Sequence, residues 1–214
     1  MQDSSTVVLT SKISIMAYTC QEYEARLTSW RAQLDQEKVV CGEDQLLWEE
    51  PSQLYYTLAV NSPGRIFPTF FCFPHLDIAQ QIVLYWTGLM FMHVSQYTVE
   101  RRIKQHDASL PSLYSTDTER TTAQAKCMEL AINITKSLEY FVHPDTGLTA
   151  VDFLGLPVNL AYGYLTQFGA KERLWFDVIF TRLSAMSPGF GEFMKAMASE
   201  GGGGKAFRQF VLQQ

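Results

Sequence analysis

Residues 77–94 constrain the fold more than any other segment, because their apolar residues do not keep to one side of a helix. Asp77 stands at the start, where the dipole of a helix favours a carboxylate. Apolar side chains then cover nearly every face, at Ile78, Ile82, Leu84, Tyr85, Trp86, Leu89, Met90, Phe91 and Val94. Such a helix leaves little surface for water and belongs in the middle of a bundle. The sequence therefore predicts an all-α fold built around this helix.

Periodicity and end signals predict further helices around the central one. They are expected over about 21–41, 51–58, 121–142, 157–168, 171–186 and 190–198. Two prolines interrupt the apolar segment 65–74, which should be an extended connector whose aromatic side chains are buried. Residues 101–119 are polar and predict a surface loop that ends in a helix start signal.

The N-terminal segment differs from the rest of the chain. Residues 1–20 contain the β-branched run 6–10, which suits a short strand or an extended arm. With 214 residues, 47% of them hydrophobic, the chain is long enough for one core. We therefore expect a single-domain helical bundle over 21–214, with a short extended N-terminal arm and a glycine-rich C-terminal tail.

Charge and cysteine spacing exclude several classes of function. The formal net charge of −5 has the wrong sign for binding phosphate backbones, so no direct nucleic acid binding is expected. The four cysteines are far apart in sequence and form no zinc-binding pattern, and we found no nucleotide motif, so we expect neither a metal nor a cofactor. The longest apolar window, 78–94, contains polar residues and is too short for a membrane span. We expect a soluble, cytoplasmic protein.

Three motifs stand out together, F-x-F-P-H-L-x-x-A at 71–79, Y-W-x-G-L-M-F-M-H at 85–93 and I-x-x-x-K-S-L-E-Y-F at 132–141. They resemble the fungal-specific transcription factor domain, the C-terminal domain of fungal zinc binuclear-cluster regulators. The resemblance covers roughly residues 45–210 and consists of hydrophobic patterns, which indicate a fold better than an activity. The six-cysteine zinc cluster of the family is absent here. A chain without it cannot read DNA as the family does.

Several side chains are candidates for a binding or catalytic site. His93, Asn133 and Tyr140 are the predicted hydrogen-bond or proton donors. The residues predicted to line a cavity for an apolar ligand are Tyr85, Trp86, Met90, Tyr97, Asn159, Tyr162 and Trp175. Stripes of this kind also occur as ordinary core, and that alternative stays open. Lys136 and Glu139 are expected to face solvent, although a lysine at the mouth of a pocket can hold an acidic ligand.

Two main hypotheses about function follow. In the first, the transcription-factor-like domain works alone and binds a hydrophobic small molecule as a cofactor-independent cyclase or isomerase in fungal terpenoid or polyketide biosynthesis. A pericyclic reaction such as a Diels–Alder cycloaddition needs mainly a fixed substrate conformation and a donor to a carbonyl. In the second, the chain is a ligand-sensing or protein-interaction domain of a regulator, and is then nuclear. Pairing of two copies as a homodimer is a third alternative.

Overall fold

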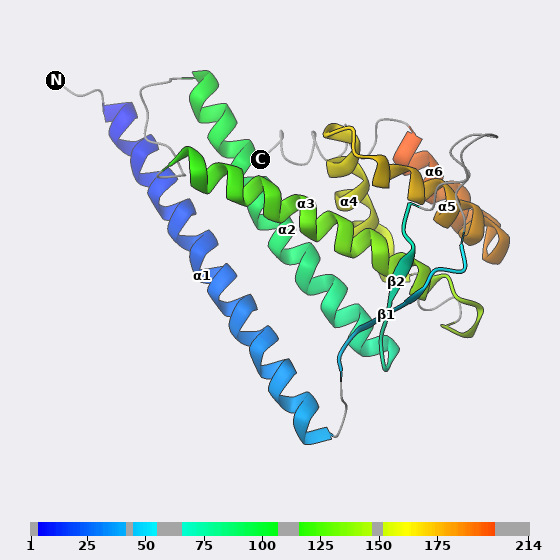
Figure 1. Ribbon diagram of the computed structural model, residues 1–214. Coiled ribbons are helices and arrows are strands. Elements are labelled where there is room, and N and C mark those ends of the chain that lie inside the picture. The colour runs from blue at the N-terminus through cyan, green and yellow to red at the C-terminus, as the bar shows by residue number, and fades with distance from the viewer. Residues whose placement is uncertain (1–3, 42–44, 55–65, 107–115, 147–151, 200–214) are drawn as a thin grey trace.

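The computed structural model describes residues 4–41, 45–54, 66–106, 116–146 and 152–199. These residues form six α-helices and one two-stranded sheet (Figure 1). The helices are α1 (Ser4–Cys41), α2 (Leu76–His106), α3 (Asp117–Phe141), α4 (Gly155–Gln167), α5 (Trp175–Met186) and α6 (Pro188–Ser199), and the strands are β1 (Trp48–Pro51) and β2 (Thr69–Cys72). The predicted all-α class is confirmed. Three short 3-10 helices join the elements, at Pro144–Thr146, Asp152–Leu154 and Lys171–Leu174.

The prediction of an extended N-terminal arm over 1–20 is wrong for the described residues, because α1 is helical from Ser4 onward. The helix lies antiparallel to α2 at the edge of the bundle (Figure 1). Ile13 is buried against Ile103 and Val99 near the far end of α2. Tertiary packing of this kind can override the low helix propensity of a β-branched residue such as Ile13.

The prediction of a helix over 51–58 is also wrong for residues 51–54, which the structure describes. Trp48–Pro51 is a strand that pairs antiparallel with Thr69–Cys72, with Trp48 opposite Cys72 and Pro51 opposite Thr69. Residues 55–58 of that prediction lie outside the described residues. The extended connector is confirmed, because β2 lies in it and Phe67, Phe70 and Phe73 are buried. Proline is acceptable in β1 because a two-stranded sheet consists of edge strands.

Local signals place the boundaries of the later helices. Thr116 and Glu119 form a capping box, in which each side chain bonds the other residue's backbone N–H, so α3 begins at Asp117. Gly169, with φ of 64°, ends the α4 segment in a conformation that side chains rarely adopt. α2 continues to His106, beyond the predicted start of the polar loop at 101, and 107–115 lie outside the described residues.

The core forms where α2, α3, α4 and α5 meet. Val83 and Met90 on α2, Ala131 and Leu138 on α3 and Phe176 on α5 belong to one contiguous buried cluster. Gly191 on α6 lies so close to α5 that an added Cβ would be 2.2 Å from the Ser184 hydroxyl. Gly88 similarly lets Leu27 of α1 come close to α2. In the part of the chain that the structure describes, no helix meets the length and hydropathy needed to cross a membrane.

Candidate functional site

Four aromatic rings follow one another around α2, and we call them the aromatic band. Trp30 of α1 packs on Tyr85 with 6.0 Å between ring centroids. The next residue, Trp86, packs on Phe71 of β2 at 5.7 Å. Trp86 is buried, whereas the other three rings are half-buried and remain accessible from outside. The band therefore connects α1, α2 and β2 through rings that could stack on an apolar guest.

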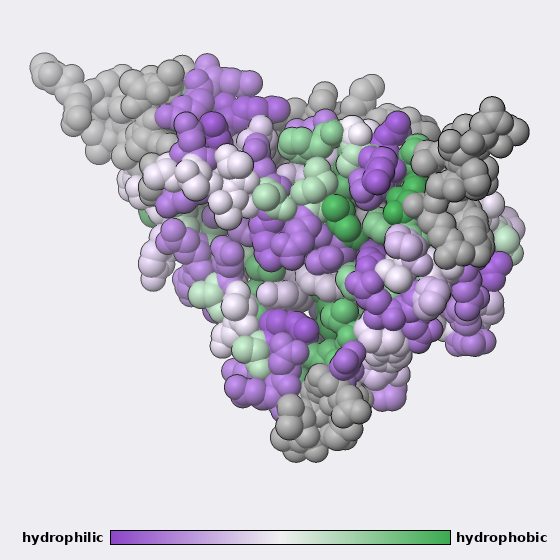
Figure 2. Space-filling model, in the orientation of Figure 1, coloured by the Kyte–Doolittle hydropathy of each residue, from purple (hydrophilic) through white to green (hydrophobic). Residues whose placement is uncertain are grey.

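Hydrophobic surface is visible in the same region of the molecule. Figure 2 shows apolar residues at the lower centre, between hydrophilic surfaces on either side. In the matching view of Figure 1, α2 passes here between α1 and β1. An apolar strip with polar margins is the usual character of a surface that binds another molecule.

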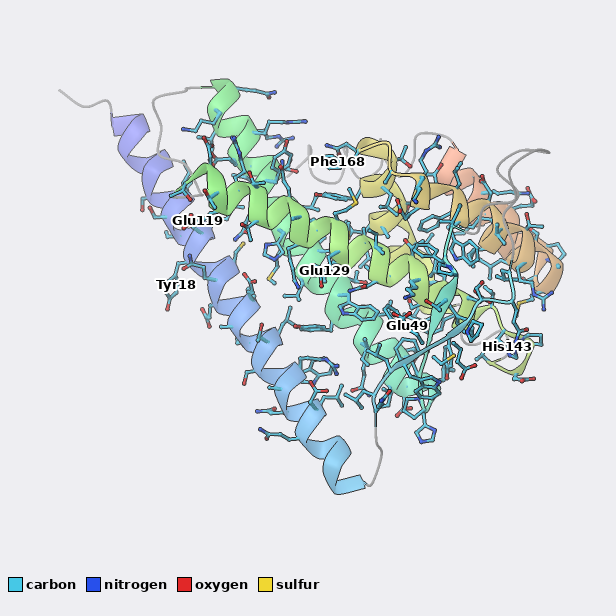
Figure 3. The ribbon with its side chains drawn as sticks, viewed as in Figure 1. Tyr18, Glu49, Glu119, Glu129, His143 and Phe168 are labelled. Carbon is cyan, nitrogen blue, oxygen red and sulfur yellow. The ribbon has the colours of Figure 1, made fainter. Side chains whose placement is uncertain are left out.

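A polar edge, formed by Glu49, Thr69 and Lys136, borders the band on the β2 side. The Lys136 ammonium lies 4.6 Å from the centroid of the Phe71 ring, within the range of a cation–π contact. The same ammonium is 2.6 Å from a Glu49 carboxylate oxygen, and Thr69 donates to the other oxygen at 2.5 Å. The hydrogen bond from Lys136, followed by that from Thr69, lowers the pKa of Glu49. The Lys136 ammonium is thus held beside the aromatic surface and is paired there with the Glu49 carboxylate (Figure 3 labels Glu49).

Tyr140 lies one helical turn beyond Lys136 on α3. Its ring packs edge-on against Phe73 at 5.1 Å, and Phe73 follows β2 closely in sequence. Burial, together with nearby Cys72 and Asp77, raises the pKa of the Tyr140 phenol. The group therefore stays protonated at neutral pH and can act there as a hydrogen-bond donor.

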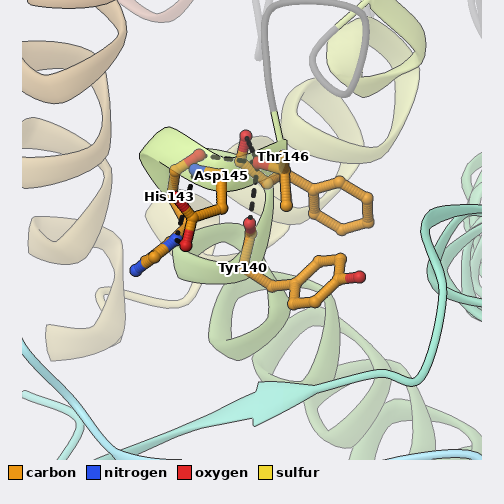
Figure 4. Close-up of polar contacts among 5 residues, drawn as sticks. Tyr140, His143, Asp145 and Thr146 are labelled. Atoms are coloured by element: carbon orange, nitrogen blue, oxygen red, sulfur yellow. Dashed lines mark hydrogen bonds and ion pairs between the residues drawn. The ribbon is translucent and has the colours of Figure 1, made fainter.

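The turn after α3 fixes the end of the helix that carries Tyr140. The Thr146 hydroxyl lies 3.2 Å from the Tyr140 carbonyl oxygen and 2.7 Å from that of His143. The Nδ1 atom of His143 lies 3.4 Å from an Asp145 carboxylate oxygen in the same turn. Figure 4 shows the Tyr140 ring projecting away from His143, so these contacts hold its backbone and leave the phenol separate from the turn.

His93 occupies a different place from Tyr140. It is buried on α2, with its Nε2 atom 3.6 Å from a Glu24 carboxylate oxygen of α1, and this atom has no hydrogen-bond partner among the described residues. The 16 positions from Asp77, beside Tyr140, to His93 correspond to about 24 Å along α2. The two predicted donors therefore do not reach the same reacting atom. Asn133 is half-buried on α3, one turn before Lys136.

The remaining predicted ligand contacts are distributed over two parts of the core. Met90 is fully buried within it, and Tyr97 is half-buried further along α2. In the α4–α5 region, Tyr162 packs on Phe176 at 5.3 Å, and Trp175 packs edge-on against Phe67 at 5.6 Å. Asn159 is half-buried on α4. Of the predicted residues, Tyr85 and Trp86 are therefore the ones that the structure places in the aromatic band.

The expectation that Glu139 faces solvent is wrong. Its side chain is 3% exposed and accepts hydrogen bonds from Ser52 Oγ at 2.6 Å, from the Gln53 backbone N–H at 2.7 Å and from the Leu54 N–H at 3.3 Å. The carboxylate thus attaches the chain after β1 to α3. Lys136, expected on the same solvated face, is only 14% exposed. Ser52, which follows β1, and Glu139 on α3 are 87 positions apart in sequence. The periodicity of the α3 segment by itself could therefore not show that they meet.

Sequence reasoning also missed Trp30 and Phe71 as partners of the band. Trp30 recurs at the spacing of an amphipathic helix and Phe71 lies in the connector, but neither pattern shows which ring it meets. Among the described residues no group of three or more metal-ligating side chains occurs. Burial raises the pKa of Cys72 and of Cys127 to about 12, so neither thiol is an activated nucleophile.

No protein-family model matches this chain, and no curated protein or solved structure matches it at a significant level. The fold and the site define an all-α domain in which the central helix carries the aromatic band, and the polar edge borders that band. The resemblance to fungal regulators stays a prediction from sequence motifs.

Proposed function

We propose that this chain is a helical domain that binds a hydrophobic small molecule on the aromatic band. The single observation that carries the proposal is the presence of two ring pairs, Trp30 on Tyr85 and Phe71 on Trp86, on successive residues of α2, with the Lys136 ammonium over the Phe71 ring. The rings suit a flat or unsaturated apolar body, and the ammonium suits an acidic or carbonyl group at its end. The ligand class is therefore an apolar molecule with one anionic or carbonyl terminus.

The enzymatic form of the proposal is cofactor-independent cyclisation or isomerisation of a terpenoid or polyketide intermediate. Such a reaction is accelerated when a site holds the substrate in a near-attack conformation. The Tyr140 phenol is the donor that would polarise a carbonyl near the band, because it stays protonated and lies one turn from Lys136. His93 lies too far along α2 to take part at the same carbonyl.

The second candidate function is a regulatory domain that binds the same class of ligand without converting it. The distance between His93 and Tyr140 favours this alternative, because it leaves the band without a paired acid and base. A sensing domain needs only a ligand that binds one conformation better than another. The motifs shared with fungal regulators are consistent with this role.

Binding is tested with two fluorescent probes, anionic 8-anilinonaphthalene-1-sulfonate and neutral Nile red. We expect both to bind, and Lys136→Met to weaken the anionic probe about tenfold while leaving the neutral one nearly unchanged. Trp86→Ala should weaken both probes. Phe168→Ala is the matched control, since Phe168 is an exposed aromatic residue directly after the end of α4 and is not part of the band. If Lys136→Met affects the two probes equally, or if neither probe binds, the band is not the site.

Turnover is tested separately with linear polyene precursors that bear a terminal carbonyl, analysed by liquid chromatography and mass spectrometry. The enzymatic form predicts cyclised or isomerised product above the buffer rate, reduced in Tyr140→Phe. Binding of the probes without any product above buffer would reject the enzyme and support the regulatory domain.

A further inference from the structure

The contact between α1 and α2 is an antiparallel seam with apolar pairs along it. Trp30 packs on Tyr85 toward one end of the seam. Ile13 is buried against Ile103 toward the other end. α2 is the main neighbour of α1, which lies at the edge of the bundle (Figure 1). The seam therefore decides whether α1 stays attached, and α1 can open locally while the core between the other helices persists.

A polar pair interrupts the seam between these two apolar contacts. The Nε2 atom of His93 on α2 lies 3.6 Å from a Glu24 carboxylate oxygen on α1. The His93 side chain is 10% exposed, whereas that of Glu24 is 44% exposed and keeps contact with water. Nε2 has no hydrogen-bond partner among the described residues, since 3.6 Å is too long for a hydrogen bond. A neutral imidazole thus leaves a buried polar atom unsatisfied, which costs stability.

Protonation of the imidazole changes the energy of this pair. An imidazolium ring carries a positive charge and an N–H donor on both nitrogens. A small movement of the half-exposed Glu24 side chain then forms a charge-assisted hydrogen bond to Nε2. Burial opposes the charged form of a histidine, and the facing carboxylate offsets this cost. The attraction stabilises the seam in mild acid and is lost as the pH rises through the range, about 5 to 8, in which histidines lose their proton.

The other ionisable groups near this part of the seam leave Glu24 as the counterion of His93. Burial raises the pKa of the Cys20 thiol, one turn before Glu24 on α1, so this group stays neutral. Glu100, two turns beyond His93 on α2, has contacts of its own. On α3, which also packs on α2, every charged side chain has a partner away from His93. These contacts are Asp117–Arg120, Thr116–Glu119, Lys126–Glu129, Glu49–Lys136 and Ser52–Glu139.

We propose that His93 and Glu24 form an acid-strengthened clasp, in which protonation of His93 fastens α1 to α2 in mildly acidic surroundings. At neutral pH the clasp is released, and α1 is held by the apolar contacts of the seam alone. The clasp is a regulatory device of the fold, because it couples the attachment of one helix to the acidity of the surroundings. It acts within the chain itself and does not depend on the ligand proposed above.

The experiment is hydrogen–deuterium exchange of the full chain at about pH 5.5 and about pH 7.5, the two sides of the histidine range. Rates are corrected for the intrinsic effect of pH, and peptides of α1 are compared with peptides of the buried helix α5 in the same sample. We expect the protection of α1 relative to α5 to be about fivefold higher in acid, the effect of an ion pair that is partly exposed. Glu24→Gln and His93→Gln should each abolish this difference, because neither can form the charged pair.

His143→Gln is the matched control. The His143 imidazole also lies beside a carboxylate, at 3.4 Å from Asp145, but the pair is on the turn after α3 and not in the seam. This variant should keep the pH dependence of the wild type. Equal relative protection of α1 at both pH values in the wild type, or an unchanged difference in Glu24→Gln, would overturn the proposal. Circular dichroism checks folding, and if His93→Gln does not fold, the half-exposed Glu24→Gln decides alone.

Discussion

Substitution of the buried Glu139 should destabilise the fold by an amount that depends on how many of its carboxylate oxygens the new side chain replaces. Oε2 accepts from Ser52, and Oε1 accepts from the backbone N–H groups of Gln53 and Leu54. In Glu139→Ala the Gln53 N–H loses its acceptor, whereas the Leu54 N–H retains the Ser52 hydroxyl at 3.2 Å. One orphaned donor and one lost charge-assisted bond amount to about 3 kcal/mol.

Glu139→Gln should cost much less. Its amide oxygen can still accept from the Gln53 and Leu54 N–H groups, and its NH₂ group can donate to the Ser52 hydroxyl, which itself donates to the Leu54 carbonyl at 3.1 Å. The loss is then about 1 kcal/mol, the difference between a charged and a neutral acceptor. We therefore expect the free energy of unfolding to decrease in the order wild type, Glu139→Gln, Glu139→Ala. The reason is that both backbone N–H groups donate to the same oxygen, which the amide oxygen of glutamine can replace.

The assay is equilibrium unfolding in urea followed by far-ultraviolet circular dichroism. Glu129→Ala is the control, since Glu129 is exposed on the same helix and its contact with Lys126 at 3.2 Å is a surface ion pair. It makes the same change of helix propensity and should lower the free energy of unfolding by less than about 0.5 kcal/mol. The reasoning is refuted if Glu139→Ala lies within about 1 kcal/mol of the wild type, or if Glu139→Gln is as unstable as Glu139→Ala.

Three further predictions concern local features. Gly191→Ala should destabilise the fold by about 1–3 kcal/mol in thermal unfolding, because its Cβ would meet atoms of α5 at 2.2 to 2.4 Å. The control Gly189→Ala has open space around its Cβ and should not destabilise the fold. Thr116→Ala removes a capping bond and should cost about 1 kcal/mol in urea unfolding; no change would show that α3 does not depend on its cap. Cys72 and Cys127, each with a pKa of about 12, should react with a thiol reagent at pH 8 only after unfolding, and fast labelling of the native protein would contradict their burial.

The sequence by itself determined the helical class and several helix ends. The central helix is identified by its apolar residues, Thr116 and Glu119 form the cap that starts α3, and Gly169 ends the α4 segment. These signals act within a few residues along the chain, so they can be interpreted without knowledge of the rest of the fold.

Only the tertiary structure decided the features that depend on contacts between distant segments. Trp48–Pro51 became a strand because Thr69–Cys72 lies beside it. α1 is helical through its β-branched run, and Ile13, three residues beyond that run, is buried against α2. Glu139 is buried because residues after β1 donate hydrogen bonds to its carboxylate, and the sequence of α3 does not indicate these donors. The grouping of Tyr85 and Trp86 with rings of α1 and β2 arose in the same way. Periodicity gives the face of a side chain, but the identity of its neighbour depends on how the elements pack.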